Sequence, residues 1–264
     1  MRKIIFSKLL VPILIIIIIV LGSYILIKGN FKEKVTNENQ ATSPIAKEST
    51  APLLIDKSLY EEKTYTDSTK YTTFKVTYPQ FKNASAGFNQ EIKNLVMEGI
   101  ETHKKDSEDT WKIRYENRAP GDTITEFPKA DEKFDFSVTW KPAQANAKFI
   151  NLILTISGYN GGVHGYATLV SFNYDVAKKK EITLADLFPG DANYLKTVSE
   201  FSRKNLEAQF GKDLVVSMLN EGTMPTEDNF SVFTFTPDTI TFYFNQYQVA
   251  PYAMGVSKVT MPRK

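Results

Sequence analysis

The sequence contains no cysteine and only two histidines, His103 and His164. The absence of cysteine excludes disulfide bonds, thiolate nucleophiles, thiolate zinc sites and an acylated lipoprotein cysteine. The two histidines are far apart, and no His-Glu-x-x-His or His-x-x-x-His spacing occurs. Such spacings are what place two histidines on one metal ion. We therefore expect neither a metal site nor a cofactor.

An excess of charge of either sign is also missing. The chain has 32 Lys and Arg against 30 Asp and Glu, a net charge of +2, so it lacks the basic surface of a nucleic-acid-binding protein. No G-x-S-x-G elbow and no phosphate-binding glycine loop occurs. Carboxylates such as Glu227 and Asp228 lie in hydrophilic stretches, where we expect them to be solvated. The sequence predicts no nucleic-acid partner, no catalytic residue and no enzymatic activity.

One long uncharged run lies near the N-terminus, at residues 9–27. At about 1.5 Å per residue, a helix of this length just crosses a hydrocarbon core of about 30 Å. We expect residues 1–8 to be a short cytoplasmic tail, 9–27 a single transmembrane anchor in the cell membrane, and 28–58 a flexible stalk. A cleaved signal peptide is the alternative. Under either interpretation the remaining chain lies outside the cytoplasm.

The rest of the chain alternates between strand and helix patterns. Phe88, Ile92, Val96 and Ile100 have helical spacing, which predicts an amphipathic helix from 88 to about 105 with His103 on its solvated side. Helix is also expected at 192–210. Strands are expected at 71–78, 134–140, 149–156, 166–174, 230–235, 240–244 and 258–261. This order indicates an α+β fold of antiparallel sheets with helices packed on one face, in two tandem modules, 59–160 and 161–264.

Two segments stand out as recognition surfaces. His164 lies in a loop with four glycines, where it either hydrogen-bonds to a turn carbonyl or contacts a ligand. Tyr243, Tyr247 and Tyr252 lie among amide side chains at a strand end and in the loop that follows. Tyrosine combines apolar area with a polar tip and is common at binding surfaces. We expect part of this aromatic content to pack in the core and part to form a binding rim.

A set of motifs in this order resembles a known family. The motifs are residues 161–165 (GGVHG), 172–175 (FNYD), 180–188 (KEITLADLF), 242–247 (FYFNQY) and 250–255 (APYAMG). They resemble the extracytoplasmic domain of RsiV-like anti-sigma factors, which is also similar to the non-catalytic front modules of PdaC-type peptidoglycan deacetylases. The similarity covers about residues 60–262. The eight residues ahead of the predicted span are too few to hold a sigma factor, and no catalytic deacetylase domain is recognisable in the chain.

The resemblance implies a binding function. In the anti-sigma family the domain is a lysozyme receptor, and binding exposes the anti-sigma factor to proteolysis. The resemblance thus implies a membrane-anchored module that recognises lysozyme or cell-wall peptidoglycan, with Pro251, Tyr252, Tyr247, His164 and Gly162 as candidate ligand-binding residues. A sensor that signals through a separate membrane partner and a cell-wall hydrolase are the alternatives. The hydrolase would require His164 to hydrogen-bond to a buried carboxylate in a cleft.

Overall fold

The computed structural model describes residues 54–263. The predicted transmembrane anchor and nearly all of the predicted stalk lie outside these residues. Within them, no helix is both long enough and apolar enough to span a bilayer. The last residues assigned to the stalk belong to the folded part, because the Leu54 carbonyl accepts from Ala145 N–H and Asp56 N–H donates to the Ala145 carbonyl.

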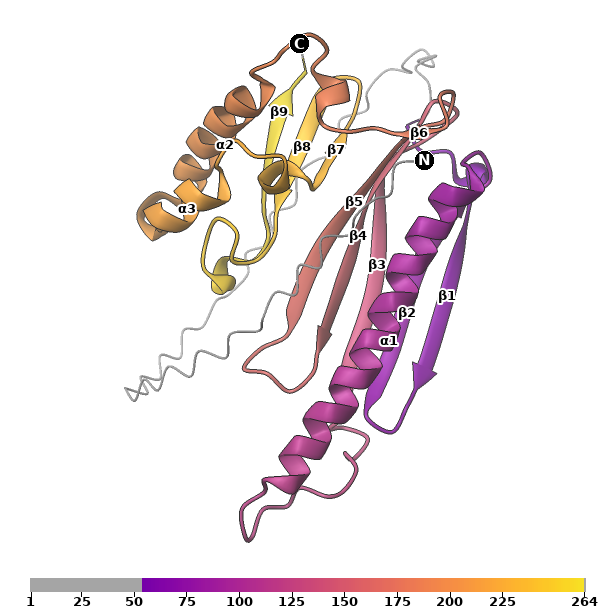
Figure 1. The fold of residues 1–264 in the computed structure, drawn as a ribbon, viewed down its shortest axis with the longest axis vertical. Helices are drawn as coiled ribbons and strands as arrows, with labels where there is room; N and C mark the ends of the chain where they lie inside the picture. The colour runs from indigo at the N-terminus through magenta and orange to yellow at the C-terminus, as the bar shows by residue number, and fades with distance from the viewer. Residues whose placement is uncertain (1–53, 264) are drawn as a thin grey trace, which may run out of the picture. The chain divides into compact units, whose positions relative to one another are not determined.

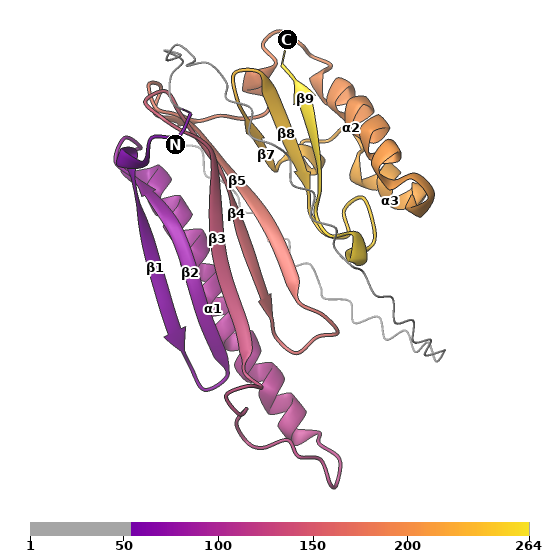
Figure 2. The same cartoon turned by 180° about the vertical axis from the view of Figure 1, so that it is seen from behind.

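A six-stranded sheet in the order β1-β2-β3-β4-β5-β6 forms the first module (Figure 1). Its strands are β1 (Tyr60–Ser68), β2 (Thr72–Phe81), β3 (Phe134–Ala145), β4 (Phe149–Tyr159), β5 (Tyr166–Asp175) and β6 (Lys180–Glu181). β5 pairs with β4 along its whole length, so the first sheet continues past the predicted module boundary at residue 160. Helix α1 (Ala86–Glu116) lies along one face of this sheet (Figures 1 and 2).

The first sheet is mixed, which corrects the prediction of purely antiparallel sheets. β2 and β3 are parallel, with Thr72 opposite Phe134 and Val76 opposite Val138, whereas the other neighbouring strands are antiparallel. Two consecutive strands that are joined by a long crossover helix can pair in parallel, and α1 supplies that crossover. The alternation of apolar and polar residues along a strand shows which of its faces is buried, but it does not show whether the neighbouring strand is parallel or antiparallel.

Helix α1 confirms the predicted amphipathic helix and extends well beyond residue 105. Its N-cap is Ser85, whose Oγ accepts from the Phe88 N–H at 3.2 Å. The predicted face is buried at Phe88, Ile92, Val96 and Ile100, and it continues through Trp111. Ion pairs on the outer surface of the extra turns, such as Lys112 with Glu108, support this exposed end of the helix.

His103 is buried, contrary to the prediction that it is solvated. Only 2% of the residue is exposed, and its Nδ1 lies 3.0 Å from the Tyr166 hydroxyl of β5. Burial lowers the pKa of His103, although Asp135 and Asp106 oppose that shift. Burial also raises the pKa of Tyr166 to about 12. The prediction failed because the polar residues that follow His103 in sequence lie on the outer side of the helix, whereas His103 itself lies on the sheet side.

We expect the stability of the protein to depend on pH because His103 is buried. Because its pKa is lower in the folded than in the unfolded state, the unfolded chain binds more protons once the pH falls below the unfolded value of about 6.5. Because of His103, the free energy of unfolding should therefore fall as the pH drops below about 6.5, by at most about 1.4 kcal/mol for each pH unit. His103→Gln keeps a polar partner for Tyr166 and should remove this contribution. Urea unfolding between about pH 7.5 and 5.5 measures it, and equal pH slopes for the two proteins would contradict the assignment.

The second module is a three-stranded antiparallel sheet in the order β7-β8-β9. Its strands are β7 (Phe233–Phe235), β8 (Thr239–Phe244) and β9 (Ser257–Pro262). Helices α2 (Tyr194–Phe210) and α3 (Val216–Gly222) belong to it (Figures 1 and 2). Short 3-10 helices occur at η1 (Lys57–Leu59), η2 (Ala185–Leu187), η3 (Gly211–Asp213), η4 (Asp228–Phe230) and η5 (Tyr252–Met254). A separate apolar core lies around Val198, Leu206 and Phe242, and none of the three is more than 1% exposed.

The entry to the second module follows a local sequence signal. Thr183 and Asp186 form a capping box, because Thr183 N–H donates to the Asp186 carboxylate at 2.9 Å and Asp186 N–H donates to Thr183 Oγ1 at 3.4 Å. Gly211 ends α2 with φ of 50°, a conformation that glycine adopts at little cost.

Polar side chains of the first sheet form hydrogen bonds with the backbone at the outer edge of β7. These side chains are Gln144, Asn151, Ser171 and Asn173. Gln144 Nε2 donates to the Phe235 carbonyl at 2.9 Å, and Asn173 Nδ2 donates to the Phe233 carbonyl at 3.0 Å. The N–H groups of Phe235 and Phe233 donate to Asn151 Oδ1 and Ser171 Oγ. The backbone N–H and C=O groups on this edge of β7 thereby pair with side chains instead of with another strand.

Candidate functional site

Three aromatic rings from two distant segments meet at one place. The rings of His164 and Tyr252 are stacked, with centroids 3.7 Å apart and planes inclined by 18°. Tyr247 lies beside both, with its centroid 5.7 Å from that of Tyr252 and 6.1 Å from that of His164. His164 is exposed, and Tyr247 is 55% exposed. This ring cluster (His164, Tyr247 and Tyr252) combines the β4–β5 loop with the segment between β8 and β9.

The β4–β5 loop is held against α1 by a glycine. Gly161 has φ of +91°, and a Cβ there would lie 2.9 Å from Thr110 Cγ2 and 3.1 Å from the Phe134 ring. Only glycine fits both the backbone conformation and the close approach. The loop therefore leaves the sheet in a fixed direction that brings His164 to Tyr252.

Tyr247 has an unusual backbone conformation. Its φ is +67°, which is rare for a bulky side chain and costs roughly 1–3 kcal/mol. Hydrogen bonds of the two preceding amide side chains offset the cost of this conformation. Asn245 Oδ1 accepts from Leu169 N–H at 2.7 Å, and Gln246 Oε1 accepts from Ala167 N–H at 3.1 Å. Gln248 Nε2 donates to two further backbone carbonyls. A strained residue that its surroundings hold in place and that carries a half-exposed ring is a feature of functional sites.

The polar atoms of the ring cluster are bonded to one another. The Gly165 carbonyl lies 2.8 Å from His164 Nδ1 and accepts a second bond from the Tyr252 hydroxyl at 2.9 Å. A carbonyl can only accept, so Nδ1 carries a proton toward Gly165, and Nε2 lies 3.0 Å from the Tyr247 hydroxyl. The expected bond from His164 to a turn carbonyl is thus present. Within the described residues His164 has no carboxylate partner, so the geometry that a hydrolase would require is not formed.

The structure brings three of the five candidate residues into direct contact. Gly162 lies in the same exposed loop as His164, next to the fully exposed Val163. Pro251 precedes Tyr252 at the start of η5. Tyr243 does not take part, because its half-buried side chain lies on β8 with its hydroxyl 3.3 Å from Thr234 Oγ1.

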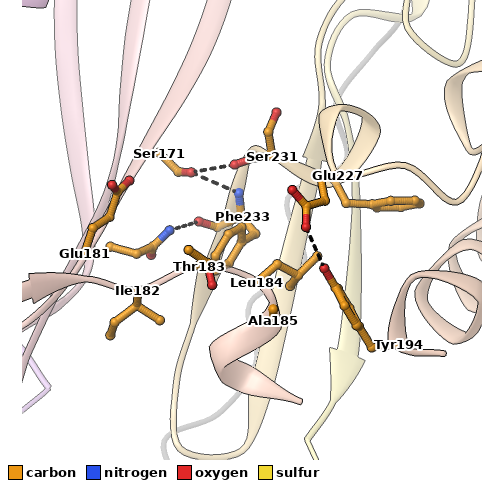
Figure 3. Close-up of a pocket in the computed structure, with 12 residues that line it drawn as sticks. Ser171, Glu181, Ile182, Thr183, Leu184, Ala185, Tyr194, Glu227, Ser231 and Phe233 are labelled. Atoms are coloured by element: carbon orange, nitrogen blue, oxygen red, sulfur yellow. Dashed lines mark hydrogen bonds between the residues drawn. The ribbon is translucent and has the colours of Figure 1, made fainter. Parts of the chain in front are cut away.

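Sequence reasoning missed the fixed role of three amide side chains. Asn245, Gln246 and Gln248 hold the backbone around Tyr247. The presence of three amide side chains in one short segment was the sequence feature that could have indicated this role. A second group, formed by Glu181, Glu227 and Asn173, lines a cavity that the sequence did not indicate (Figure 3). Among the described residues no three His, Asp or Glu side chains gather as a metal site would require.

Comparison with known proteins assigns the two modules. Residues 65–167 match the family described as deacetylase PdaC, and residues 185–264 match the family described as a protein of unknown function, DUF3298. We call the two matched segments the PdaC module (residues 65–167) and the DUF3298 module (residues 185–264). The predicted resemblance to the front modules of PdaC-type proteins is thereby confirmed.

Individual relatives cover different parts of the chain. Over 205 residues, or 77% of its length, the chain is 25% identical to the peptidoglycan-N-acetylmuramic acid deacetylase PdaC of Bacillus subtilis. Over 112 residues, or 42% of its length, it is 30% identical to the immunogenic protein MPT64 of Mycobacterium tuberculosis. The chain spans only 40% of the length of the first relative and 48% of the second.

A solved structure shares the fold. A DUF3298 family protein from Bacteroides fragilis matches with a TM-score of 0.52 over 77% of this chain and 89% of that protein, at 18% identity. The two matched segments, residues 65–167 and 185–264, follow one another along the chain, and the structure has a six-stranded and a three-stranded sheet.

Proposed function

We propose that this chain is a membrane-anchored module outside the cytoplasm that binds cell-wall peptidoglycan through the ring cluster. The observation that carries the proposal is the preformed, exposed arrangement of His164, Tyr247 and Tyr252. The residues next to it hold it in place by hydrogen bonds, so little conformational entropy would be lost when a ligand binds.

The chemistry of the ring cluster suits a glycan. A sugar ring has apolar C–H faces and polar edges, and tyrosine likewise combines an apolar ring with a polar tip. The half-exposed ring of Tyr247 offers its apolar area to such a face, and Gly162 lies in the exposed loop that carries His164. Neither an acid–base pair nor a metal is needed for binding of this kind.

The comparisons support the same ligand class. One relative, matched over 205 residues or 77% of this chain, is by name a peptidoglycan deacetylase. The deacetylase activity in that name refers to the whole relative, of which this chain spans 40%. We therefore propose only the recognition of the wall polymer, and lysozyme, which the anti-sigma resemblance implies, is the competing ligand.

Removal of either tyrosine of the ring cluster should weaken binding of peptidoglycan fragments. A stacked aromatic ring is typically worth about 1–3 kcal/mol, so Tyr252→Ala and Tyr247→Ala should each lower the affinity roughly 10- to 100-fold. Calorimetric titration of the full chain in detergent micelles with soluble muropeptides measures this. Tyr115→Ala, a tyrosine near the end of α1 and outside the ring cluster, is the matched control and should bind as the wild type does.

The same titration separates the competing functions. Binding of c-type lysozyme but not of muropeptides, with loss in Tyr252→Ala, would replace the proposal by a lysozyme receptor. Binding of muropeptides that survives both tyrosine substitutions would place the site elsewhere. The absence of binding to either ligand would contradict the proposed function altogether.

A further inference from the structure

The buried His103 and the ring cluster are joined by a short chain of contacts. His103 Nδ1 lies 3.0 Å from the hydroxyl of Tyr166, the first residue of β5. Gly165 precedes Tyr166, and its carbonyl lies 2.8 Å from His164 Nδ1 and accepts from the Tyr252 hydroxyl at 2.9 Å. A displacement of Tyr166 would therefore move the carbonyl to which two of the three rings are bonded.

The chain is tightly packed where the β4–β5 loop joins the sheet. Gly158 pairs with Tyr166 at the end of the two strands. A Cβ on Gly158 would lie 2.6 Å from the Asp135 carbonyl oxygen and 3.2 Å from His103 Cε1. A Cβ on Gly165 would lie 3.1 Å from the Gly158 carbonyl oxygen. His103 thus fills the space under this loop neck (Gly158, Gly165 and Tyr166), and water reaches its ring only if the packing opens.

The surroundings of the His103 ring suit its neutral form. The rings of Phe74 and Phe136 lie beside it, with centroids 6.1 Å and 5.1 Å away. Its Nε2 is buried and has no hydrogen-bond partner among residues 54–263. A protonated imidazole has an N–H on both nitrogens, so this place would hold a buried positive charge as well as an unpaired donor.

The titratable groups near this ring are two aspartates and one tyrosine. Asp106 lies on α1, Asp135 on β3 and Tyr166 on β5. The contacts from β2 and β4 are Phe74 and Gly158, which carry no charge. Both aspartates favour the protonated ring, but in the described part of the chain neither forms a hydrogen bond with it, and burial is the larger effect that lowers its pKa. Burial raises the pKa of Tyr166 to about 12, so its hydroxyl stays neutral.

We infer that His103 is a pH-sensitive switch for the ring cluster: the neutral ring keeps the loop neck closed, and protonation opens the neck and separates His164 from Tyr252. Once the neck is open, the proton binds at the ordinary pKa of about 6.5. Each pH unit below that value therefore favours the open form by up to about tenfold. Loops and strand ends open at a lower free-energy cost than the core of a sheet, so the neck is the part that opens.

Amide hydrogen exchange of the full chain in detergent micelles tests the switch without any ligand. After correction for the intrinsic exchange rate, the protection of residues 158–166 should fall about three- to tenfold between about pH 7.5 and 5.5. At low concentrations of urea this protection should hardly depend on urea, which identifies a local opening. The internal reference is β1 (Tyr60–Ser68), which has no hydrogen bond or ring contact with His103 in the described chain. Its protection should change less than about twofold.

Two variants separate the two histidines. His103→Gln keeps a polar partner for Tyr166 but does not titrate, so the protection of residues 158–166 should be the same at both pH values. His164→Gln removes the exposed histidine and leaves His103, so the fall should persist. A thermal unfolding curve verifies that both variants fold.

Three results would overturn the inference: constant protection of the loop neck in the wild type, an equal fall in β1, or a fall that remains in His103→Gln. Because no ligand is present, the outcome is independent of the proposed function. A chain that binds no muropeptide can still show the switch, and a chain without the switch can still bind.

The wild-type comparison of the loop neck with β1 needs no variant, so it decides the matter even where a substitution prevents folding.

Discussion

Gly222→Ala is expected to lower the free energy of unfolding by about 3 kcal/mol or more. A Cβ at this last residue of α3 would lie 2.0 Å from the Gln248 carbonyl oxygen and 2.8 Å from Val249 Cγ1. Ordinary contacts between such atoms are about 3.5–4.0 Å, and the nearest atom is backbone, so no flexible side chain can move aside. Either α3 or the segment after β8 must shift.

The same substitution should also affect binding at the ring cluster. Gln248 holds the backbone beside Tyr247, since its Oε1 accepts from Asn245 N–H at 3.1 Å. Displacement of Gln248 therefore removes a support of the strained Tyr247 conformation, and we expect loss of muropeptide binding even where the chain remains folded. Urea unfolding followed by circular dichroism measures the first effect, and calorimetric titration measures the second.

Gly87→Ala is the matched control for that experiment. Gly87 lies in the first turn of α1, and a Cβ there would have its nearest neighbour at 3.9 Å. Glycine in a helix costs about 0.5–1 kcal/mol relative to alanine, so this identical chemical change should stabilise the protein by roughly that amount. An unfolding free energy for Gly222→Ala within about 0.5 kcal/mol of the wild type would show that the close approach to Gln248 is not a constraint.

Substitution of Gln144 and Asn173 together should uncouple the two modules. Each side chain donates to a β7 carbonyl, so the double change to alanine leaves the carbonyls of Phe233 and Phe235 without these partners. A buried carbonyl without a partner costs about 1–3 kcal/mol, which gives a total loss of about 2–6 kcal/mol. Because the apolar cores of the two modules are separate, the module that is less stable alone should then unfold first.

The positions of the tryptophans make this separation measurable. The chain has two tryptophans, Trp111 and Trp140, and both belong to the PdaC module. Tryptophan fluorescence therefore reports on that module, whereas far-ultraviolet circular dichroism reports on both. In the wild type the two signals should give one transition. In Gln144→Ala with Asn173→Ala they should diverge.

An exposed amide pair provides the control for the double substitution. Gln90 Nε2 donates to Asn94 Oδ1 at 2.6 Å on the solvent side of α1. Changing both to alanine removes the same types of side chain but leaves no buried carbonyl unpaired, so we expect coincident transitions and a change of less than about 1 kcal/mol. Coincident transitions in the buried variant as well would contradict the role of the side-chain bonds to β7.

Local patterns correctly predicted the elements that form the two cores. The spacing of Phe88, Ile92 and Val96 identified α1 and its buried face, and the strand expected at residues 149–156 is β4, which pairs on both sides. The capping box of Thr183 and Asp186 is also a local signal, which needs no tertiary partner to be recognised.

Local sequence patterns predicted the candidate site only in part. Tyrosines among amides and a histidine among glycines marked both halves of the ring cluster, but not that they meet. The cavity at Glu181 and Asn173 gave no sequence signal, since an acidic residue in a polar turn and an asparagine inside a strand have the same pattern when they are solvated.

Local patterns predicted most of the helices and strands, although not the mostly exposed β1 (Tyr60–Ser68), and they predicted which residue types gather at the two loops. Three features became visible in the folded chain alone: the parallel pairing of β2 with β3, the burial of His103, and the hydrogen bonds from side chains to the edge strand β7. The physical reason is distance along the chain. Periodicity is a property of one segment and records which face is apolar. The contacts that decided the rest join residues between 60 and 91 positions apart, such as Asn173 with Phe233 and Gln144 with Phe235, and no local pattern encodes them.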